Sequence, residues 1–226
     1  MTAIPYSGVT RRRLLLGSAS VLLAGCDSTP SLSLVKDSFS VAFPDSSAYP
    51  RSREQVDAQP YAQLGVRIGG GARGIMVLSE KRADELYWIS ANRVLLVTRK
   101  GRIVRTVGLP TDVLGTRIET RDLLDYYDPE HPQIDGLETA LSIDVGNAYG
   151  AKILSRYHVE GSETITVLGE SYDTLRVREQ LSCDSWSWRA TSMHWLSKRS
   201  AMMWRSRQSL AKGLPPIEFE TLKRPG

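Results

Sequence analysis

The sequence predicts a mainly β protein in which antiparallel sheets form a sandwich or a partial barrel, with one N-terminal helix and an irregular central excursion. Two observations support this class. Short runs of β-branched and aromatic residues recur from Tyr61 to the C-terminus, with turn residues between them. No long helical segments alternate with these runs, as a parallel doubly wound sheet would require.

The N-terminal helix is predicted by apolar residues at positions 32, 35, 39, 42 and 43, which fall on one helical face. Pro44 is expected to end it. Residues 44–60 are rich in Pro, Ser, Asp and Arg and are expected to form a linker or surface loop.

About a dozen strands are expected, in two groups. The first group is Leu64–Ile68, Ile75–Ser79, Leu86–Ser90, Val94–Thr98 and Ile103–Val107. The second is Leu141–Val145, Ala151–Val159, Thr164–Leu168, Leu175–Gln180, Ser185–Ala190, Met202–Ser206 and Ile217–Leu222, with turns at Glu160-Gly161 and Gly169-Glu170. Gly101 can supply the positive φ that a tight hairpin needs between the last two strands of the first group.

The segment between the two groups, residues 109–136, is interrupted by repeated Pro and Gly. These residues break any long element. We expect an irregular excursion there, with one helical turn near Leu123.

The N-terminus has the pattern of a lipoprotein signal. Three arginines at 11–13 precede an apolar run, Leu14–Ala24, which is too short to span a bilayer and ends in Leu23-Ala24-Gly25-Cys26. We therefore expect residues 1–25 to be a signal peptide, Cys26 to carry lipid, 26–33 to be a tether and 34–226 to be a single domain.

The export route and the membrane remain open at this stage. Thr10 to Leu15 resembles a twin-arginine consensus, but an ordinary secretory signal fits as well. Asp27 is similar to the inner-membrane retention signal of enteric bacteria, a rule that does not extend to all bacteria.

Charge and cysteine content exclude several classes. The 226 residues include 29 Lys and Arg against 25 Asp and Glu, and removal of residues 1–25 takes away three arginines and no acid, which leaves a net charge near zero. Nucleic-acid binding is therefore not expected. Once Cys26 is lipidated, Cys183 has no partner for an intramolecular disulfide and is expected to be a small core residue.

Candidate chemical motifs are weak. Gly69–Gly74 matches a dinucleotide-binding spacing, but the strand predicted directly after it argues for a glycine-rich hairpin and against a cofactor. His131, His158 and His194 are far apart, so no metal site is expected. The acid-rich stretch with Asp122, Asp125, Asp128, Glu130, His131 and Asp135 could hold a cation or act on a sugar, but a solvated loop is the preferred interpretation.

The C-terminal segment is rich in tryptophan and arginine. Trp186 and Trp188 are two residues apart, so both indoles would project from one face of a strand. Trp186, Trp188 and Trp204 are candidate glycan-binding residues, because exposed indoles stack on sugar rings and nearby arginines contact acidic glycans. The alternative is that they form part of the core.

Several strings together resemble the YjbF/GfcB family of bacterial lipoproteins. They are Pro60-Tyr61-Ala62, Tyr87-Trp88, the run from Val94 to Leu109, the run from Tyr172 to Glu179, and Met203-Trp204-Arg205-Ser206-Arg207-Gln208. The similarity covers about residues 30–224 and includes the lipobox.

The resemblance implies a β-rich, periplasm-facing lipoprotein that assists export or assembly of an exopolysaccharide or capsule. It implies no catalytic residues and no cofactor, and it carries over only Cys26 as a functional position. Expected partners are the membrane, through the N-terminal lipid, then the exopolysaccharide and proteins of the export machinery. A periplasmic polysaccharide hydrolase or lyase and an envelope scaffolding protein remain as alternatives.

Overall fold

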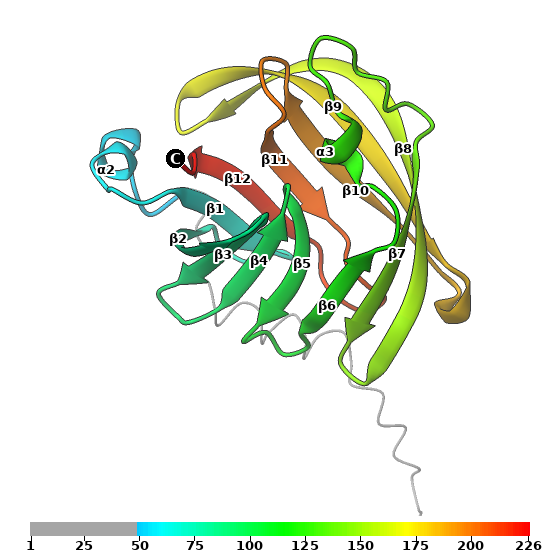
Figure 1. Ribbon diagram of the computed structural model, residues 1–226. Helices are drawn as coiled ribbons and strands as arrows, with labels where there is room; N and C mark the ends of the chain where they lie inside the picture. Colours follow the sequence, from blue (N-terminus) through cyan, green and yellow to red (C-terminus); the bar gives the residue numbers. More distant parts are fainter. Residues whose placement is uncertain (1–48) are drawn as a thin grey trace, which may run out of the picture. The chain divides into compact units, whose positions relative to one another are not determined.

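The computed structural model describes residues 49–226 (Figure 1). The predicted signal peptide, lipidated Cys26, tether and helix at 32–43 lie outside the described residues. No helix among those described has the length and apolar character required to cross a bilayer.

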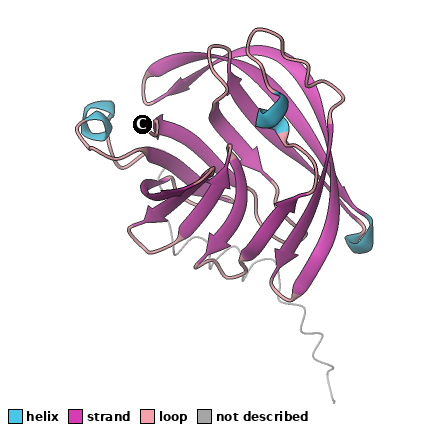
Figure 2. Cartoon of the chain, viewed as in Figure 1, coloured by secondary structure: helices cyan, strands magenta, loops and turns pink. Residues whose placement is uncertain are grey.

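The described chain is mainly β, as predicted, and its strands form one antiparallel sheet that curls into a nearly closed barrel (Figures 1 and 2). The elements are α2 (Arg53–Asp57), β1 (Gln63–Ile68), β2 (Gly74–Arg82), β3 (Glu85–Ser90), β4 (Leu95–Arg99), β5 (Arg102–Val107), β6 (Val113–Ile118), α3 (Leu123–Tyr126), β7 (Glu138–Val145), β8 (Ala148–Val167), β9 (Glu170–Cys183), the 3-10 turn η1 (Asp184–Trp186), β10 (Trp188–Ser197), β11 (Met203–Gln208) and β12 (Ile217–Lys223).

The strand order is β5-β4-β3-β2-β1-β12-β11-β10-β9-β8-β7-β6. Sequence neighbours pair as hairpins, and the first strand of the described chain pairs with the last, so both lie in the middle of the sheet. The two edge strands of this order are β5 and β6. The turn between them is held by side chains, because Thr106 Oγ1 donates to Asp112 Oδ1 at 2.9 Å and accepts from the amide of Val113 at 2.9 Å.

The hairpin predicted around Gly101 is confirmed. Gly101 has φ +82° and Lys100 has φ +45°, so both turn residues adopt the left-handed conformation that a two-residue hairpin favours. A Cβ at Gly101 would also lie 3.0 Å from the sulfur of Met203. Glycine is therefore required at this position both for its backbone conformation and for the space it leaves.

Four details of the predicted element order are wrong. The expected linker at 44–60 contains α2, whose N-cap Ser52 forms a capping box with Gln55. The excursion at 109–136 contains a strand, β6, as well as the predicted helical turn near Leu123. Glu160-Gly161 does not form a turn: β8 runs through it with a bulge. The strand expected at 185–190 is split by η1.

The long β8–β9 hairpin explains why the barrel has two apolar clusters. The larger cluster fills the interior, and Ile217 and Phe219 on β12 belong to it. Side chains alternate along a strand, so Leu222 projects to the outer face. There the tip of the hairpin brings Ile165 and Val167 together with Leu222, Trp204 and Val56 of α2 in a second, smaller cluster.

Candidate functional site

The barrel interior contains a buried group of polar residues, which we call the interior network. Its members are Arg102, Asp122, Ser155, Tyr157, Glu179, His194, Ser206 and Gln208, and they come from β5, the N-terminus of α3, β8, β9, β10 and β11. Because β5 is an edge strand and β9 lies far from it in the strand order, this network joins two distant parts of the sheet across the interior.

The guanidinium of Arg102 is the centre of the interior network. Its Nε donates to Asp122 Oδ2 at 2.5 Å, and its Nη2 lies 2.9 Å from Asp122 Oδ1 and 2.6 Å from Glu179 Oε1. Tyr157 donates to Asp122 Oδ1 at 2.7 Å. Asp122 is also the N-cap of α3, so the same carboxylate that pairs with Arg102 fixes the start of this helical turn.

Glu179 links the ion pair to the other side of the interior. Oε1 accepts from Ser155 Oγ, and Oε2 lies 2.9 Å from Nε2 of His194. The other ring nitrogen of His194 is 2.9 Å from Ser206 Oγ. The buried polar groups therefore satisfy one another, which is the condition under which such groups are tolerated inside a protein.

The ionisation of the two carboxylates in the interior network is determined by the charges and hydrogen bonds around them. Burial alone would raise the pKa of Glu179, but the positive charge of Arg102 and hydrogen bonds from His194 and Ser155 outweigh it, and the pKa lies well below its usual range. The pKa of Asp122 is lowered in the same way, with burial opposed chiefly by Arg102. Both carboxylates are thus ionised at neutral pH around one permanent cation.

A buried ion cluster with complete pairing acts as a structural connection. Gln208 extends it, because its side chain accepts from the amide of Ile103 at 2.9 Å and donates to the carbonyl of Gly101 at 2.7 Å. Edge strand β5 is thereby tied to β9 and β11 through side chains rather than through a neighbouring strand on its free side.

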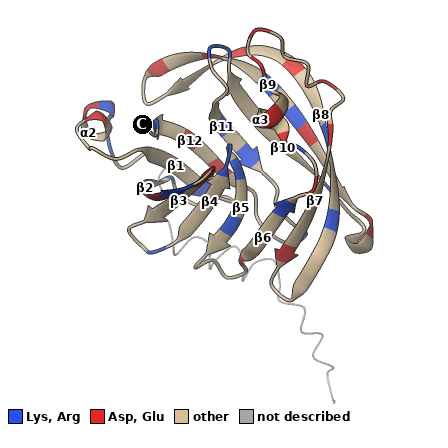
Figure 3. Cartoon of the chain, in the orientation of Figure 1, with Lys and Arg blue, Asp and Glu red and all other residues tan. Residues whose placement is uncertain are grey.

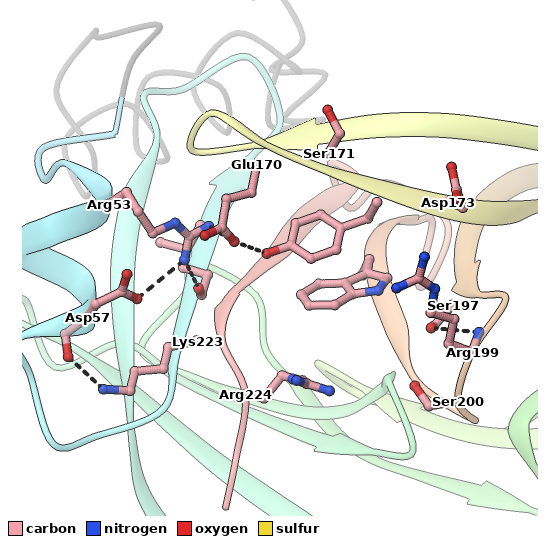
Figure 4. Close-up of a pocket in the computed structure, with 13 residues that line it drawn as sticks. Arg53, Asp57, Glu170, Ser171, Asp173, Ser197, Arg199, Ser200, Lys223 and Arg224 are labelled. Carbon is pink, nitrogen blue, oxygen red and sulfur yellow. Dashed lines mark hydrogen bonds and ion pairs between the residues drawn. The ribbon is translucent and has the colours of Figure 1, made fainter.

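A second polar region lies on the outer surface and is formed by four separate segments (Figure 4). We call it the cationic pocket, and its volume is about 480 Å³. Arg53 and Asp57 come from α2, and Lys223 and Arg224 from the C-terminus. The remaining lining residues are Glu170, Ser171, Tyr172 and Asp173 at the β8–β9 tip, Ser197, Arg199 and Ser200 at the β10–β11 turn, and Trp204 and Leu222 of the outer cluster.

Two cations of the cationic pocket are occupied by structural contacts. Arg53 donates to the carbonyls of Leu222 at 2.6 Å and Val167 at 3.0 Å, and it lies near Asp57 and Glu170. Lys223 Nζ donates to the carbonyls of Asp57 and Gln59. These contacts attach α2 to the hairpin tip and to β12, so Arg53 and Lys223 build the pocket wall.

Trp204 is buried, at 8% exposure, and packs in the outer apolar cluster. The ring of Tyr172 stacks on it with centroids 3.7 Å apart, and the guanidinium carbon of Arg224 lies 5.7 Å from its centroid. Burial and a hydrogen bond to Glu170 raise the pKa of Tyr172 to about 12, so its hydroxyl stays protonated. The Trp204 indole therefore lines the pocket while its neighbours cover most of its surface.

Arg199 and Arg224 differ from Arg53 and Lys223, the other two cations of the pocket, in the contacts that their charged groups make. Within residues 49–226 neither guanidinium lies within 4.0 Å of a carboxylate, although both line the cationic pocket. Arg224 is held over Trp204, and the backbone amide of Arg199 is fixed by the hydroxyl of Ser197 at 3.2 Å. Figure 4 shows Arg199, Arg224 and Ser200 on one side of the β8–β9 tip, whereas the side chains of Ser171 and Asp173 point away from them.

The neighbouring outer face contains arginines in a different state, which we call the paired arginines. Glu218 bridges Arg67 and Arg207, and Glu220 bridges Arg73 and Arg205, with N–O distances of 2.5 to 3.2 Å. Figure 3 shows how acidic and basic positions alternate over these strands. Each carboxylate already serves two cations, so this face stabilises the pairing of β11, β12 and β1.

The predicted tryptophans lie at opposite ends of β9. Trp204 lies near its start, in the cationic pocket, while Trp186 and Trp188 lie beyond its end. Trp186 belongs to η1 and Trp188 to β10, so the expectation that one strand face presents both is wrong. Their rings meet edge to face with centroids 6.4 Å apart and both are half-buried against the interior core.

The acid-rich stretch is mostly the solvated loop that the sequence favoured, with one exception. Asp128, Glu130, His131 and Asp135 are exposed, whereas Asp122 is buried in the interior network. Cys183 is buried and unpaired, as predicted. Gly69–Gly74 joins β1 to β2, as the hairpin interpretation required.

Sequence reasoning missed Glu179 and His194, but a signal was present. Glu179 stands between Val177 and Leu181 at the inward spacing of β9, and His194 has the same place between Ser192 and Leu196 of β10. A charged or imidazole group at an inward position predicts an interior partner. No comparable pattern surrounds Arg53 or Arg224, which the pocket brings together from the two ends of the described chain.

A family model matches most of the chain, and a curated relative and a solved structure are similar to it. Residues 36–222 match the family model described as "Group 4 capsule polysaccharide lipoprotein gfcB, YjbF". The chain is similar to a lipoprotein of Escherichia coli strain K12 named "Uncharacterized lipoprotein GfcB", with 25% identity over 94% of this chain and 98% of the relative. The fold is similar to the crystal structure of the hypothetical lipoprotein YmcC from E. coli K12, with a TM-score of 0.66, 22% identity, and coverage of 86% of this chain and 94% of that one.

Proposed function

Given that the chain belongs to the YjbF/GfcB family of group 4 capsule polysaccharide lipoproteins, we propose that it is a lipid-anchored, periplasm-facing accessory protein that assists the export or assembly of a capsule or exopolysaccharide. In this proposal it handles the polymer by binding, without cleaving it. Its partners are the membrane, through lipid on Cys26, then the polysaccharide and proteins of the export machinery.

The observation that carries this proposal is the family match over most of the chain, together with the lipobox that precedes it. A thiol at Cys26 after Ala24-Gly25 is the acceptor that a lipoprotein signal requires. Lipid there would hold the domain at a membrane surface, where an exported polymer passes.

The carboxylates support a binding role over hydrolysis. A glycosidase requires two carboxyl groups facing one substrate bond, one of them free to donate a proton. Asp122 and Glu179 are enclosed in the interior network around Arg102, and Asp125 pairs with Lys100. These acids are engaged with cations, which holds them in their ionised form.

The experiment that tests the proposal is deletion of the gene in its own host, followed by measurement of surface polysaccharide. We expect the amount at the surface to fall, and to be restored by the wild-type gene. A Cys26→Ala gene should fail to restore it, because the protein would lose its anchor. Unchanged surface polysaccharide after deletion would contradict the proposal.

The same proposal requires that the protein does not cleave the polysaccharide. Purified protein incubated with the host polysaccharide should not change its molar-mass distribution in light scattering. A reduction in chain length that disappeared in an Asp125→Asn variant would instead establish a hydrolase or lyase.

A further inference from the structure

We propose that the cationic pocket binds an acidic sugar unit of the polysaccharide, with the sugar's anionic group held by Arg199 and Arg224. This inference rests on the proposed function and adds to it the site and the class of sugar. It predicts that the polymer carries a charged substituent such as a uronate carboxylate.

The two guanidinium groups differ from the other arginines of this surface in their ionic partners. The paired arginines share Glu218 and Glu220, and Arg53 is bound to carbonyls and flanked by two acids. Arg199 and Arg224 line a concave pocket, and in the described part of the chain neither forms a salt bridge. Guanidinium groups bind carboxylates and phosphates with two parallel hydrogen bonds, so two unpaired ones in one pocket form an anion site.

The other polar groups of the lining suit a saccharide. Ser200 at the β10–β11 turn both donates and accepts hydrogen bonds, while Glu170 accepts from the hydroxyl of Tyr172 and Asp173 accepts from Thr164 Oγ1 at 3.0 Å. A sugar acid carries an anionic group for the arginines and, on the same ring, hydroxyl groups for the side chain of Ser200.

The size of the cationic pocket and the packing of its lining also suit a small ligand. A pocket of about 480 Å³ lies within the range of about 300 to 1,000 Å³ found for small-molecule sites. Its lining includes the stacked pair of Tyr172 and Trp204, and the guanidinium of Arg224 lies over the Trp204 ring. Trp204 therefore positions an arginine rather than stacking on the sugar itself, which refines the role expected for it from the sequence.

The test is calorimetric titration of the full-length protein, purified in detergent, with trigalacturonic acid. Maltotriose is the neutral sugar control, and inorganic phosphate and glycerol 1-phosphate represent the anion without the sugar acid. We expect saturable binding of trigalacturonic acid that weakens as salt is added, because the contact is ionic. Equal binding of maltotriose, tighter binding of either phosphate compound, or no binding of trigalacturonic acid would overturn the inference.

Two variants and one matched control locate the site. Arg199→Gln and Arg224→Gln should each weaken trigalacturonic acid binding about tenfold or more, because each removes a charged hydrogen-bond donor. Arg105→Gln removes the same charge from an exposed position on β5, outside the pocket, and should leave the affinity unchanged. Equal loss in all three variants would indicate a general charge effect and overturn the assignment to this pocket.

Complementation in the host separates the two proposals. If wild-type protein restores surface polysaccharide in the deletion strain and the Arg199→Gln, Arg224→Gln double variant restores it equally, the pocket assignment fails while the accessory function stands. If deletion changes nothing, the accessory function fails whatever the pocket binds. We expect the double variant, at wild-type abundance, to restore less surface polysaccharide than Arg105→Gln.

Discussion

The interior network and the cationic pocket use the same residue types in opposite ways. Inside the barrel, Arg102 is surrounded by Asp122 and Glu179, and every carboxylate is hydrogen-bonded. On the outer surface, Arg199 and Arg224 lie beside an aromatic pair without an ionic partner in the described chain. A paired buried charge fixes the fold, whereas an unpaired charge at a concave surface is available to a ligand. We infer from this contrast that the interior network serves stability and that the cationic pocket serves the proposed binding.

The largest effect on stability is expected from removing the central cation. Arg102→Leu leaves Asp122 and Glu179 buried without a counter-charge, which costs about 3 to 5 kcal/mol. Urea unfolding followed by circular dichroism measures this loss. Arg105→Leu on the exposed face of the same strand should change the unfolding free energy by less than about 0.5 kcal/mol. A loss below about 1 kcal/mol for Arg102→Leu would mean that the network does not hold β5.

A somewhat smaller and more local effect is expected from Trp204→Ala. The ring packs in the outer cluster and not in the interior, so its removal should cost about 3 kcal/mol and release the β8–β9 tip. Hydrogen exchange should then show faster exchange in residues 162–173 than in the wild type, while β9 near Glu179 keeps its protection. Equal loss of protection in both regions would contradict the separation of the two clusters.

Acid should weaken the interior network by a moderate amount. The pKa values of Glu179 and Asp122 are lower in the folded chain than their ordinary values of 4.5 and 3.8, so the unfolded chain takes up protons first as pH falls. Their stabilisation is therefore complete at neutral pH and is lost as the pH falls below about 5, by roughly 2 kcal/mol for Glu179 between pH 5 and pH 3.

The matched variant for this pH dependence is Glu179→Gln, which has no carboxylate to protonate. It should be less stable than the wild type at pH 7, and its unfolding free energy should fall less steeply between pH 5 and pH 3. Identical slopes for the two proteins in urea unfolding would show that Glu179 does not contribute to acid sensitivity.

The smallest effect on stability is expected in the cationic pocket. Arg199→Gln and Arg224→Gln remove no salt bridge and should change the unfolding free energy by less than about 0.5 kcal/mol, while weakening binding as described above. A destabilisation above about 2 kcal/mol in thermal or urea unfolding would show that these arginines are structural, like Arg102.

Much of the barrel could be predicted from the sequence because strand alternation and turn residues are local signals. The hairpin at Gly101 and the core position of Cys183 follow from such patterns. The split at η1 and the bulge at Glu160-Gly161 could not be predicted. Tertiary contacts decide whether a glycine forms a turn that ends a strand or a β-bulge within it.

The candidate site was less predictable for the same reason. Trp204 was identified from its residue type, but the contacts that cover its ring come from Tyr172 and Arg224, at different positions along the chain. Arg53 lies in a segment expected to be a loop, and only the curvature of the β8–β9 hairpin brings it beside Glu170. The alternation of side chains along a strand shows on which face of the sheet a residue lies. It does not show which residues of distant strands contact it.

The most direct test of the separation between stability and binding is one paired measurement on the Arg199→Gln, Arg224→Gln double variant. Its unfolding free energy and its affinity for trigalacturonic acid should be determined in the same buffer as for the wild type. We predict an unfolding free energy within about 1 kcal/mol of the wild type and an affinity reduced by about a hundredfold or to an undetectable level. Unchanged affinity in a folded double variant would contradict the account.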